Sequence, residues 1–157
     1  PVPSAGAPGG RTRLKVSGRR DQRPLRPGEC VVAPGGKHLG LLGQPGAFTV
    51  RLTDAPPVNF HRPSVDVLFR SVLSHAARTL GVILTGMGGD GAEGLLALKN
   101  AGAHTIAQDQ ATSLVYGLPR VAAERGALTE VRPLPTMAQS LVRPCFRPPR
   151  PPHLTGR

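Results

Sequence analysis

The sequence predicts an α/β domain with a doubly wound, mostly parallel sheet. From residue 64 onward, helical and strand-like segments alternate along the chain, which is typical of parallel strands joined by right-handed helical crossovers. Residues 81–84 are apolar without interruption, as expected for a strand covered on both faces of a sheet. The 157 residues suffice for one such domain.

Before residue 64 the pattern predicts short strands separated by turns. Two short β-type runs occupy residues 30–33 and 38–42, with Pro/Gly turn signals on either side. Phe48, Val50 and Leu52 alternate with polar residues, which predicts a strand with one buried face. Because these runs follow one another closely, we expect them to form hairpins.

Residues 64–76 carry the strongest helical pattern. Their apolar residues fall on one helical face: Val65, Leu68, Phe69, Val72, Leu73 and Ala76. Ser64 is the expected N-cap, because a serine oxygen can accept a hydrogen bond from a first-turn amide. Asp66 suits the positive end of the helix dipole.

A Gly-rich turn at 86–91 follows the apolar run, and the alternation then continues. Pro119 suits the first turn of a helix, and Gly102 and Gly126 suit helix ends. The expected elements are a helix at 92–101, a strand from 105 to 107, a short strand at 114–116, a helix at 119–125, a strand at 127–131 and a helix at 135–142.

The net charge of +11 belongs to the two ends of the chain. Residues 1–26 hold seven basic and one acidic residue, and residues 143–157 hold four basic residues and no acid. Both ends are rich in proline, which lacks the N–H that helices and central strands need. We therefore expect a disordered leader at 1–12, a domain at 13–142 and a disordered tail at 143–157. The nearly neutral middle, with few aromatic residues, argues against a nucleic-acid partner.

Several classes of protein are excluded by composition. Cys30 and Cys145 can form at most one disulfide, so a reducing compartment such as the cytoplasm is expected. No apolar run approaches the ~20 residues of a membrane-spanning helix, and residues 1–10 lack the features of a signal peptide. Histidine and cysteine do not cluster at metal-ligand spacing, so no metal or other cofactor is expected.

The candidate site is the turn at 86–91. It follows a buried strand and precedes a helix, the position where catalytic groups gather in open α/β sheets. Asp90 is the only acid in the turn. Its carboxylate can orient an imidazole, as the third member of a Ser–His–Asp set, or cap the following helix. The pattern alone favours the cap. A phosphate-binding loop is a weaker interpretation, because the Lys-Ser/Thr ending of such loops is missing.

Other candidate residues carry weaker signals. No serine stands in a Gly-x-Ser-x-Gly turn. His38 and His61 are placed on loops, where functional residues are common, but a structural role is the default for both. Met87 can simply fill a gap above the sheet. The residue pattern thus ends at an α/β domain with a candidate site around Asp90.

Residues 85–92, Thr-Gly-Met-Gly-Gly-Asp-Gly-Ala, resemble the catalytic domain of the chemotaxis-receptor methylesterases of the CheB type. The resemblance extends in order over residues 27–142 and implies a doubly wound α/β fold. The other segments that carry it are 33–39, 56–69, 101–108 and 116–120.

This resemblance implies hydrolysis of glutamate methyl esters on the cytoplasmic helices of methyl-accepting chemoreceptors. Many family members also deamidate glutamine at the same sites. The family mechanism uses a serine nucleophile, a histidine base and an aspartate that holds the histidine. Asp90 matches that aspartate, and Met87 matches a methionine that lines the site, between Gly86 and Gly88.

The serine and the histidine of the family precede the matched region, and residues 1–26 resemble neither. We therefore expect an N-terminally truncated catalytic domain that lacks its first strand, with no receiver domain. Such a chain should be inactive alone, because one member of a triad cannot perform the reaction. The alternative is a non-catalytic module that binds the receptor.

Overall fold

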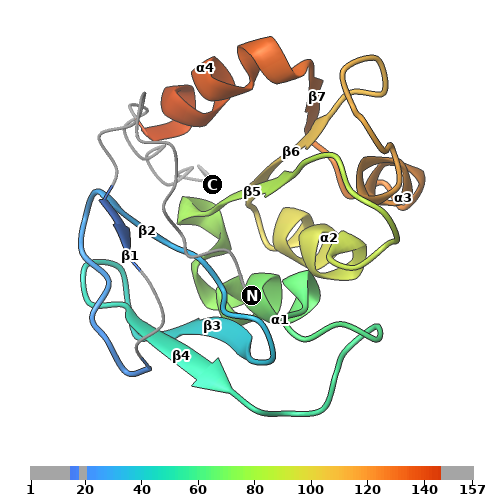
Figure 1. Ribbon diagram of the computed structural model, residues 1–157. Helices are drawn as coiled ribbons and strands as arrows, with labels where there is room; N and C mark the ends of the chain where they lie inside the picture. Colours follow the sequence, from blue (N-terminus) through green and yellow to red (C-terminus); the bar gives the residue numbers. More distant parts are fainter. Residues whose placement is uncertain (1–14, 18–20, 146–157) are drawn as a thin grey trace, which may run out of the picture.

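The structure is a computed structural model that describes residues 15–17 and 21–145. Its central element is a parallel sheet in the order β5-β6-β7, made of β5 (Leu80–Ile83), β6 (His104–Gln108) and β7 (Glu130–Arg132). The predicted parallel α/β class is confirmed by this sheet (Figure 1).

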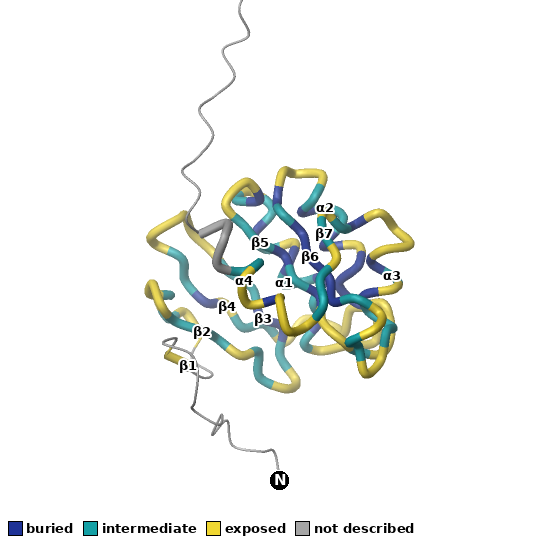
Figure 2. The backbone as a smooth tube through the Cα atoms, turned by 90° about the horizontal axis from the view of Figure 1, so that it is seen from above, coloured by how far each residue is buried: buried dark blue, intermediate teal, exposed yellow. Residues whose placement is uncertain are grey.

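Helices cover both faces of this sheet. In Figure 1, α2 (Ala92–Asn100) and α3 (Leu118–Glu124) lie on one side and α4 (Leu134–Cys145) lies on the other. Leu95 and Leu98 of α2 and Ile106 of β6 are fully buried, and buried positions concentrate in β6 and the helices beside it (Figure 2). Helices on both faces are the arrangement of a doubly wound fold.

The first half of the chain forms two small sheets. β3 (His38–Leu42) and β4 (Thr49–Thr53) form the predicted antiparallel hairpin. β2 (Glu29–Val31) pairs instead in parallel with β1 (Lys15–Ser17). The expectation that β2 would join a hairpin with β3 is therefore wrong. The turn between them leads the chain away from β2, and there the amide of Gly36 donates to the carbonyl oxygen of Arg62.

The helix expected at 64–76 is divided in two. α1 (Val65–Ser71) ends before Val72, and a 3₁₀ segment, η1 (Leu73–Arg78), continues the chain. The hydroxyl of Ser71 donates to the carbonyl oxygen of Leu68 and accepts the amide of Leu41 in β3. This tertiary contact fixes the end of α1 against β3.

Other boundaries differ by a few residues. β7 starts three residues later than predicted, and the segment at 114–116 makes only a single bridge, between Gly86 and Tyr116. α4 continues to Cys145, past its predicted end at 142. The predicted leader and the rest of the predicted tail lie outside the described residues.

Helices α1 and α2 pack at very short range. The carboxylate of Asp66 accepts the amide of Gly94 at 2.6 Å. A Cβ at Gly94 would stand 2.9 Å from Cβ of Phe69 and 3.2 Å from Cα of Asp66. Because Cα of Asp66 belongs to the backbone of α1 and Cβ of Phe69 is bonded directly to it, neither atom can rotate away.

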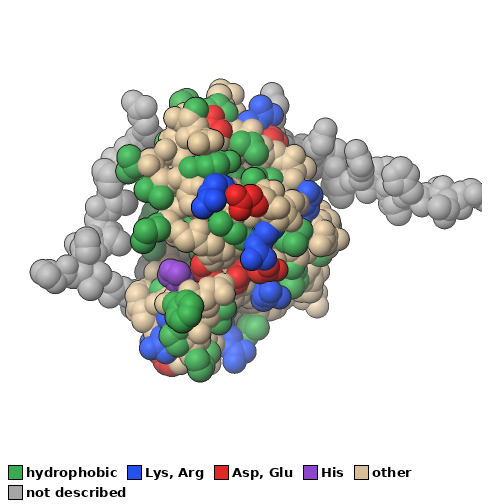
Figure 3. Space-filling view, turned by 90° about the vertical axis from the view of Figure 1, so that its right-hand side faces the viewer, with side chains coloured by type: hydrophobic (Ala, Val, Ile, Leu, Met, Phe, Trp, Pro, Cys, Tyr) green, Lys and Arg blue, Asp and Glu red, His purple; other side chains and the backbone are tan. Residues whose placement is uncertain are grey.

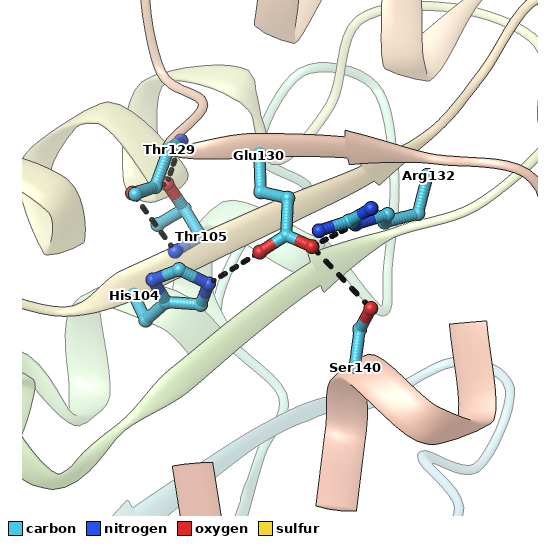
Figure 4. A network of polar contacts seen from close by, with 6 residues as sticks. All are labelled: His104, Thr105, Thr129, Glu130, Arg132 and Ser140. Atoms are coloured by element: carbon cyan, nitrogen blue, oxygen red, sulfur yellow. Dashed lines mark hydrogen bonds and ion pairs between the residues drawn. The ribbon is translucent and has the colours of Figure 1, made fainter. Parts of the chain in front are cut away.

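A polar network joins the starts of β6 and β7 to α4 (Figure 4). Glu130 accepts Nε of Arg132, lies 3.1 Å from Nε2 of His104 and accepts the hydroxyl of Ser140 at 3.3 Å. The hydrogen bond from Arg132 holds the pKa of Glu130 below its ordinary value; burial opposes this effect and the bond from His104 adds to it.

Replacing Gly94 by alanine should lower the free energy of unfolding by about 1–2 kcal/mol. Overpacking typically costs 1–3 kcal/mol, and the better helix propensity of alanine offsets at most about 1 kcal/mol. Urea unfolding of the Gly94→Ala protein measures the difference. Gly35→Ala is the control, because nothing lies within 4 Å of a Cβ at that position. Equal stability of the two variants would contradict the close packing of α1 on α2.

Replacing Glu130 by glutamine should destabilise the protein at pH 7 and much less at pH 3. A folded-state pKa below 4.5 means that the charged carboxylate contributes stability above that pH, and this contribution is lost as the pH falls through the folded-state pKa. Solvent screening keeps the loss at pH 7 within about 1 kcal/mol. Unfolding curves at both pH values test this, with the exposed Glu124→Gln as control. An equal loss at pH 3 would refute the charge-based explanation.

Candidate functional site

Asp90 lies at the end of the Gly-rich turn that follows β5. The turn is anchored on the segment before α3: the amide of Gly86 donates to the carbonyl oxygen of Val115, and its carbonyl oxygen accepts the amides of Gly117 and Leu118. Asp90 itself is only 6% exposed. Its carboxylate therefore faces the interior, at the carboxyl edge of the parallel sheet.

The carboxylate of Asp90 is held by three donors. Oδ1 accepts the hydroxyl of Ser64 at 2.7 Å and Nδ2 of Asn59 at 2.9 Å. Oδ2 accepts the backbone amide of Val65, the first residue of α1, at 2.6 Å. Both carboxylate oxygens are thus committed to the segment 59–65, which lies far from Asp90 in the sequence.

This geometry corrects the favoured interpretation of Asp90 as a cap of the following helix α2. Asp90 bonds instead to the first amide of α1, the helix that precedes it in the chain. Gly91 makes the approach possible, because its φ of +92° suits glycine and a Cβ there would stand 2.6 Å from Cγ1 of Val65. Ser64 occupies the predicted N-cap position, yet its side chain makes no cap bond of its own.

The surroundings of Asp90 favour its charged form. Burial acts to raise its pKa, but hydrogen bonds from Asn59, Ser64 and the amide of Val65 outweigh burial and hold the pKa of Asp90 below its ordinary value. The carboxylate is therefore ionised at neutral pH. A fixed, buried carboxylate of this kind can accept a hydrogen bond from an N–H or O–H group and thereby orient that group.

Asn59 links Asp90 to a second carboxylate. Its Nδ2 also donates to Oδ2 of Asp66 at 2.6 Å. Asn59 and Phe60 both have positive φ angles, of 52° and 64°, in a tight turn closed by reciprocal backbone bonds between Val58 and His61. This conformation, which asparagine tolerates better than most residues, turns the amide group toward the two carboxylates.

The two candidate histidines have different positions. His38, which the sequence analysis placed at the boundary between a loop and the β-type run 38–42, is the first residue of strand β3 and is 1% exposed. Its Nε2 lies 3.0 Å from the carbonyl oxygen of Pro56, and its Nδ1 accepts the amide of Ser64 at 3.1 Å. His61 is exposed, with Nδ1 2.5 Å from the carbonyl oxygen of Asn59. Each histidine therefore contacts a residue that donates to Asp90: buried His38 contacts Ser64, and exposed His61 contacts Asn59.

The other predicted site residues lie nearer the surface than Asp90. Met87 is 85% exposed, Gly88 is exposed and Gly86 is half-buried. Two further large apolar side chains are exposed: Phe60, next to Asn59, is fully exposed, and Leu114, next to the Val115 that bonds Gly86, is 92% exposed. Apolar side chains also appear among mixed acidic and basic residues on the face seen in Figure 3.

The sequence analysis missed Asn59, Ser64 and Asp66 as partners of the site. For Ser64 and Asp66 the local pattern already had an ordinary explanation, as a helix cap and a first-turn acid. Their bonds to Asp90, Asn59 and Gly94 cross 26, 7 and 28 positions of the sequence. No local signal indicates which distant residue a capping side chain will contact.

The described residues do not themselves contain a complete hydrolytic triad. Ser64 donates directly to Asp90. No histidine ring is hydrogen-bonded to a hydroxyl of the serines whose side chains the structure describes, which are Ser64, Ser71, Ser74, Ser113 and Ser140. Among residues 15–17 and 21–145, no three His, Cys, Asp or Glu side chains gather as metal ligands. No helix in this part of the chain has the length and apolar character to span a membrane.

Known proteins resemble this chain over most of its length. A protein-glutamate methylesterase/protein-glutamine glutaminase 1 of Anaeromyxobacter dehalogenans is 50% identical over 131 residues, which are 83% of this chain and 37% of the relative. A corresponding protein 3 of Burkholderia lata is 50% identical over 135 residues, covering 85% and 37%. The chain thus spans less than two fifths of the length of these curated relatives.

Structural and family comparisons agree with these relatives. The crystal structure of the Thermotoga maritima CheB methylesterase catalytic domain superposes with a TM-score of 0.78 at 34% identity, over 83% of this chain and 69% of that one. The family model described as CheB methylesterase matches residues 9–141. With this match over most of its length and the parallel α/β fold, the chain belongs to the CheB methylesterase family.

Proposed function

We propose that this chain forms part of a protein-glutamate methylesterase catalytic domain, and that Asp90 is the acid of its Ser–His–Asp centre. The observation that carries the proposal is the carboxylate itself. It is buried, it is held below its ordinary pKa by donors on both oxygens, and it stands at the carboxyl edge of a parallel sheet. The family match supplies the chemistry that such a carboxylate serves.

In this reaction a serine oxygen attacks the carbonyl carbon of a glutamate methyl ester, while a histidine takes the serine proton. The tetrahedral intermediate collapses to an acyl-enzyme and methanol leaves with a proton from the histidine. Water then hydrolyses the acyl-enzyme to a glutamate side chain. Asp90 holds the histidine in the correct tautomer and stabilises its charged form. Of the side chains that donate to Asp90, Asn59 is exposed and Ser64 is buried. We therefore expect the imidazole to reach the carboxylate from the side on which Asn59 lies.

The substrates follow from the family. The relatives are named both as methylesterases of protein glutamate and as glutaminases of protein glutamine. We therefore propose that the centre acts on methylated glutamates of chemoreceptors, with glutamine deamidation as a second activity on the same sites. Ester and amide share the carbonyl that the serine attacks, and they differ only in the leaving group.

By itself the chain should turn over no substrate. The described residues provide the orienting acid, but none of the serine hydroxyls that the structure describes, from Ser64 to Ser140, is paired with a histidine. A buried carboxylate alone neither attacks the ester nor transfers the proton. The nucleophile and the base must accordingly come from residues other than those described.

A second candidate is a module that binds the receptor without turnover. The exposed side chains of Phe60, Met87 and Leu114 are the observation behind it, because exposed apolar side chains that form one patch are typical of a binding surface. An amphipathic receptor helix could cover them while its glutamate side chains face the Asp90 turn. This candidate predicts binding with no release of methanol.

Methanol release from a methylated receptor tests the first proposal. The 157-residue chain should release none, whereas a chimera that carries the N-terminal part of the T. maritima domain, up to the position that corresponds to residue 9, should be active. In the chimera, Asp90→Asn should lower kcat by about 10⁴, the loss typical of a triad that has lost its acid. Glu124→Gln, on the surface of α3, is the matched control.

Two outcomes would contradict the proposal. Release by the chain alone that survives Asp90→Asn would show a different centre. A folded, active chimera that is indifferent to Asp90→Asn would remove Asp90 from the mechanism. Receptor binding by the chain alone, together with a folded but inactive chimera, would establish the binding module instead.

A further inference from the structure

We propose that Ser64 is a positioning residue for Asp90, and that buried His38 holds Ser64 in place for this task. The inference rests on the proposed role of Asp90 as the acid of the hydrolytic centre. It concerns how that carboxylate is oriented and it extends the site to β3, an element outside the central sheet.

The first step is the pair of hydrogen bonds that hold the carboxylate. Ser64 and Val65 are consecutive residues, and each binds a different oxygen of Asp90: the hydroxyl reaches Oδ1 at 2.7 Å and the amide reaches Oδ2 at 2.6 Å. Two donors spaced by the backbone fix both the position and the plane of the carboxylate. Ser64 is 2% exposed, so water cannot readily replace its hydroxyl.

The second step is the direction in which Ser64 bonds. A serine at the start of a helix ordinarily accepts an amide of the first turn. Here the first amide of α1 goes to Asp90, and the serine hydroxyl donates to Asp90 as well. Ser64 thus gives up its usual capping bond and serves as a donor to the carboxylate.

The third step is the support of Ser64 by His38. The amide of Ser64 can only donate and the carbonyl oxygen of Pro56 can only accept. His38 lies between them, with Nδ1 3.1 Å from the amide and Nε2 3.0 Å from the carbonyl oxygen. A neutral ring with its proton on Nε2 is the one form that satisfies both. At 1% exposure, the ring has no water to substitute for either partner.

The test measures the pKa of Asp90 in the full 157-residue chain. The ¹³C chemical shift of the Asp90 carboxyl carbon is recorded as a function of pH. Ser64→Ala should make Asp90 about tenfold weaker as an acid, since one hydrogen bond to a charged group is worth roughly one pKa unit. Ser64→Thr, which keeps the hydroxyl, should restore the acidity. Ser71→Ala is the matched control: it removes a bonded serine hydroxyl from the other end of α1 and should leave the pKa of Asp90 unchanged.

Two variants of His38 separate its contacts. Asparagine places an acceptor near the position of Nδ1, and glutamine places a donor near that of Nε2. His38→Asn should keep Asp90 as acidic as in the parent chain, and His38→Gln should weaken it. ¹⁵N shifts of the parent imidazole should report a protonated Nε2 and an unprotonated Nδ1. If His38 had only a structural role, both substitutions would destabilise the protein, and the pKa of Asp90 would not differ between the two variants.

The inference fails if Ser64→Ala leaves the pKa of Asp90 unchanged, or if Ser71→Ala changes it equally. In the active chimera, Ser64→Ala should lower kcat at least tenfold with little change in KM, and an unchanged kcat would overturn the positioning role. The pKa of Asp90 could respond as expected while the chimera releases methanol independently of Asp90. In that case the hydrogen bond from Ser64 to the carboxylate is supported, and the proposed function of Asp90 fails.

Discussion

The bond between the Asp90 carboxylate and the start of α1 is the interaction on which the fold and the site both depend. It joins the turn after β5 to residues that lie 25 and 26 positions earlier in the sequence. Ser64 and Asp90 are both buried. If the carboxylate were removed, the hydroxyl of Ser64 and the amide of Val65 would lose their acceptor in a place with little water, which is far costlier than losing an exposed bond.

Packing around this bond is tight because two glycines allow it. Gly91 lets the turn lie against Val65, and Gly94 lets α2 lie against α1. The same approach brings Asp66 to the amide of Gly94 and, through Asn59, to Asp90. The carboxylate is therefore oriented by the folded core itself. A group oriented in this way needs no reorganisation when charge develops beside it, which is the main source of electrostatic catalysis.

The sequence predicts those parts of this arrangement that depend on local patterns. The apolar run of β5, the Gly-rich turn and α2 follow from periodicity and turn chemistry, and the resemblance of residues 85–92 identified the family that the comparisons confirm. Two of the larger differences involve tertiary contacts. Ser71, the last residue of α1, is bonded to β3, and β2 pairs with the preceding strand β1 instead of the following strand β3.

Asp90 illustrates the limit most clearly. Its residue type and position were compatible with a cap or a catalytic acid, and the local rule favoured a cap of the next helix. The structure directs it to the previous helix instead. His38 likewise lies where a turn meets the β-type run 38–42 in the sequence, and the structure buries it as the first residue of β3. Which distant helix start a carboxylate will contact is decided by how the core packs, and that information is spread over the whole chain.

The environment of Asp90 also limits the chemistry that it can perform. Ser64 is the nearest hydroxyl, but it cannot act as the nucleophile: its alkoxide would form 2.7 Å from a carboxylate that is itself charged, and two like charges at that distance in a buried site repel strongly. Nor can Asp90 serve as the base, since a carboxylate with a lowered pKa is a poor proton acceptor. What remains is orientation of a third group that carries a proton and gains a positive charge. An imidazole has both properties, so the arrangement around Asp90 suits the acid of a triad better than any role in which the carboxylate itself reacts.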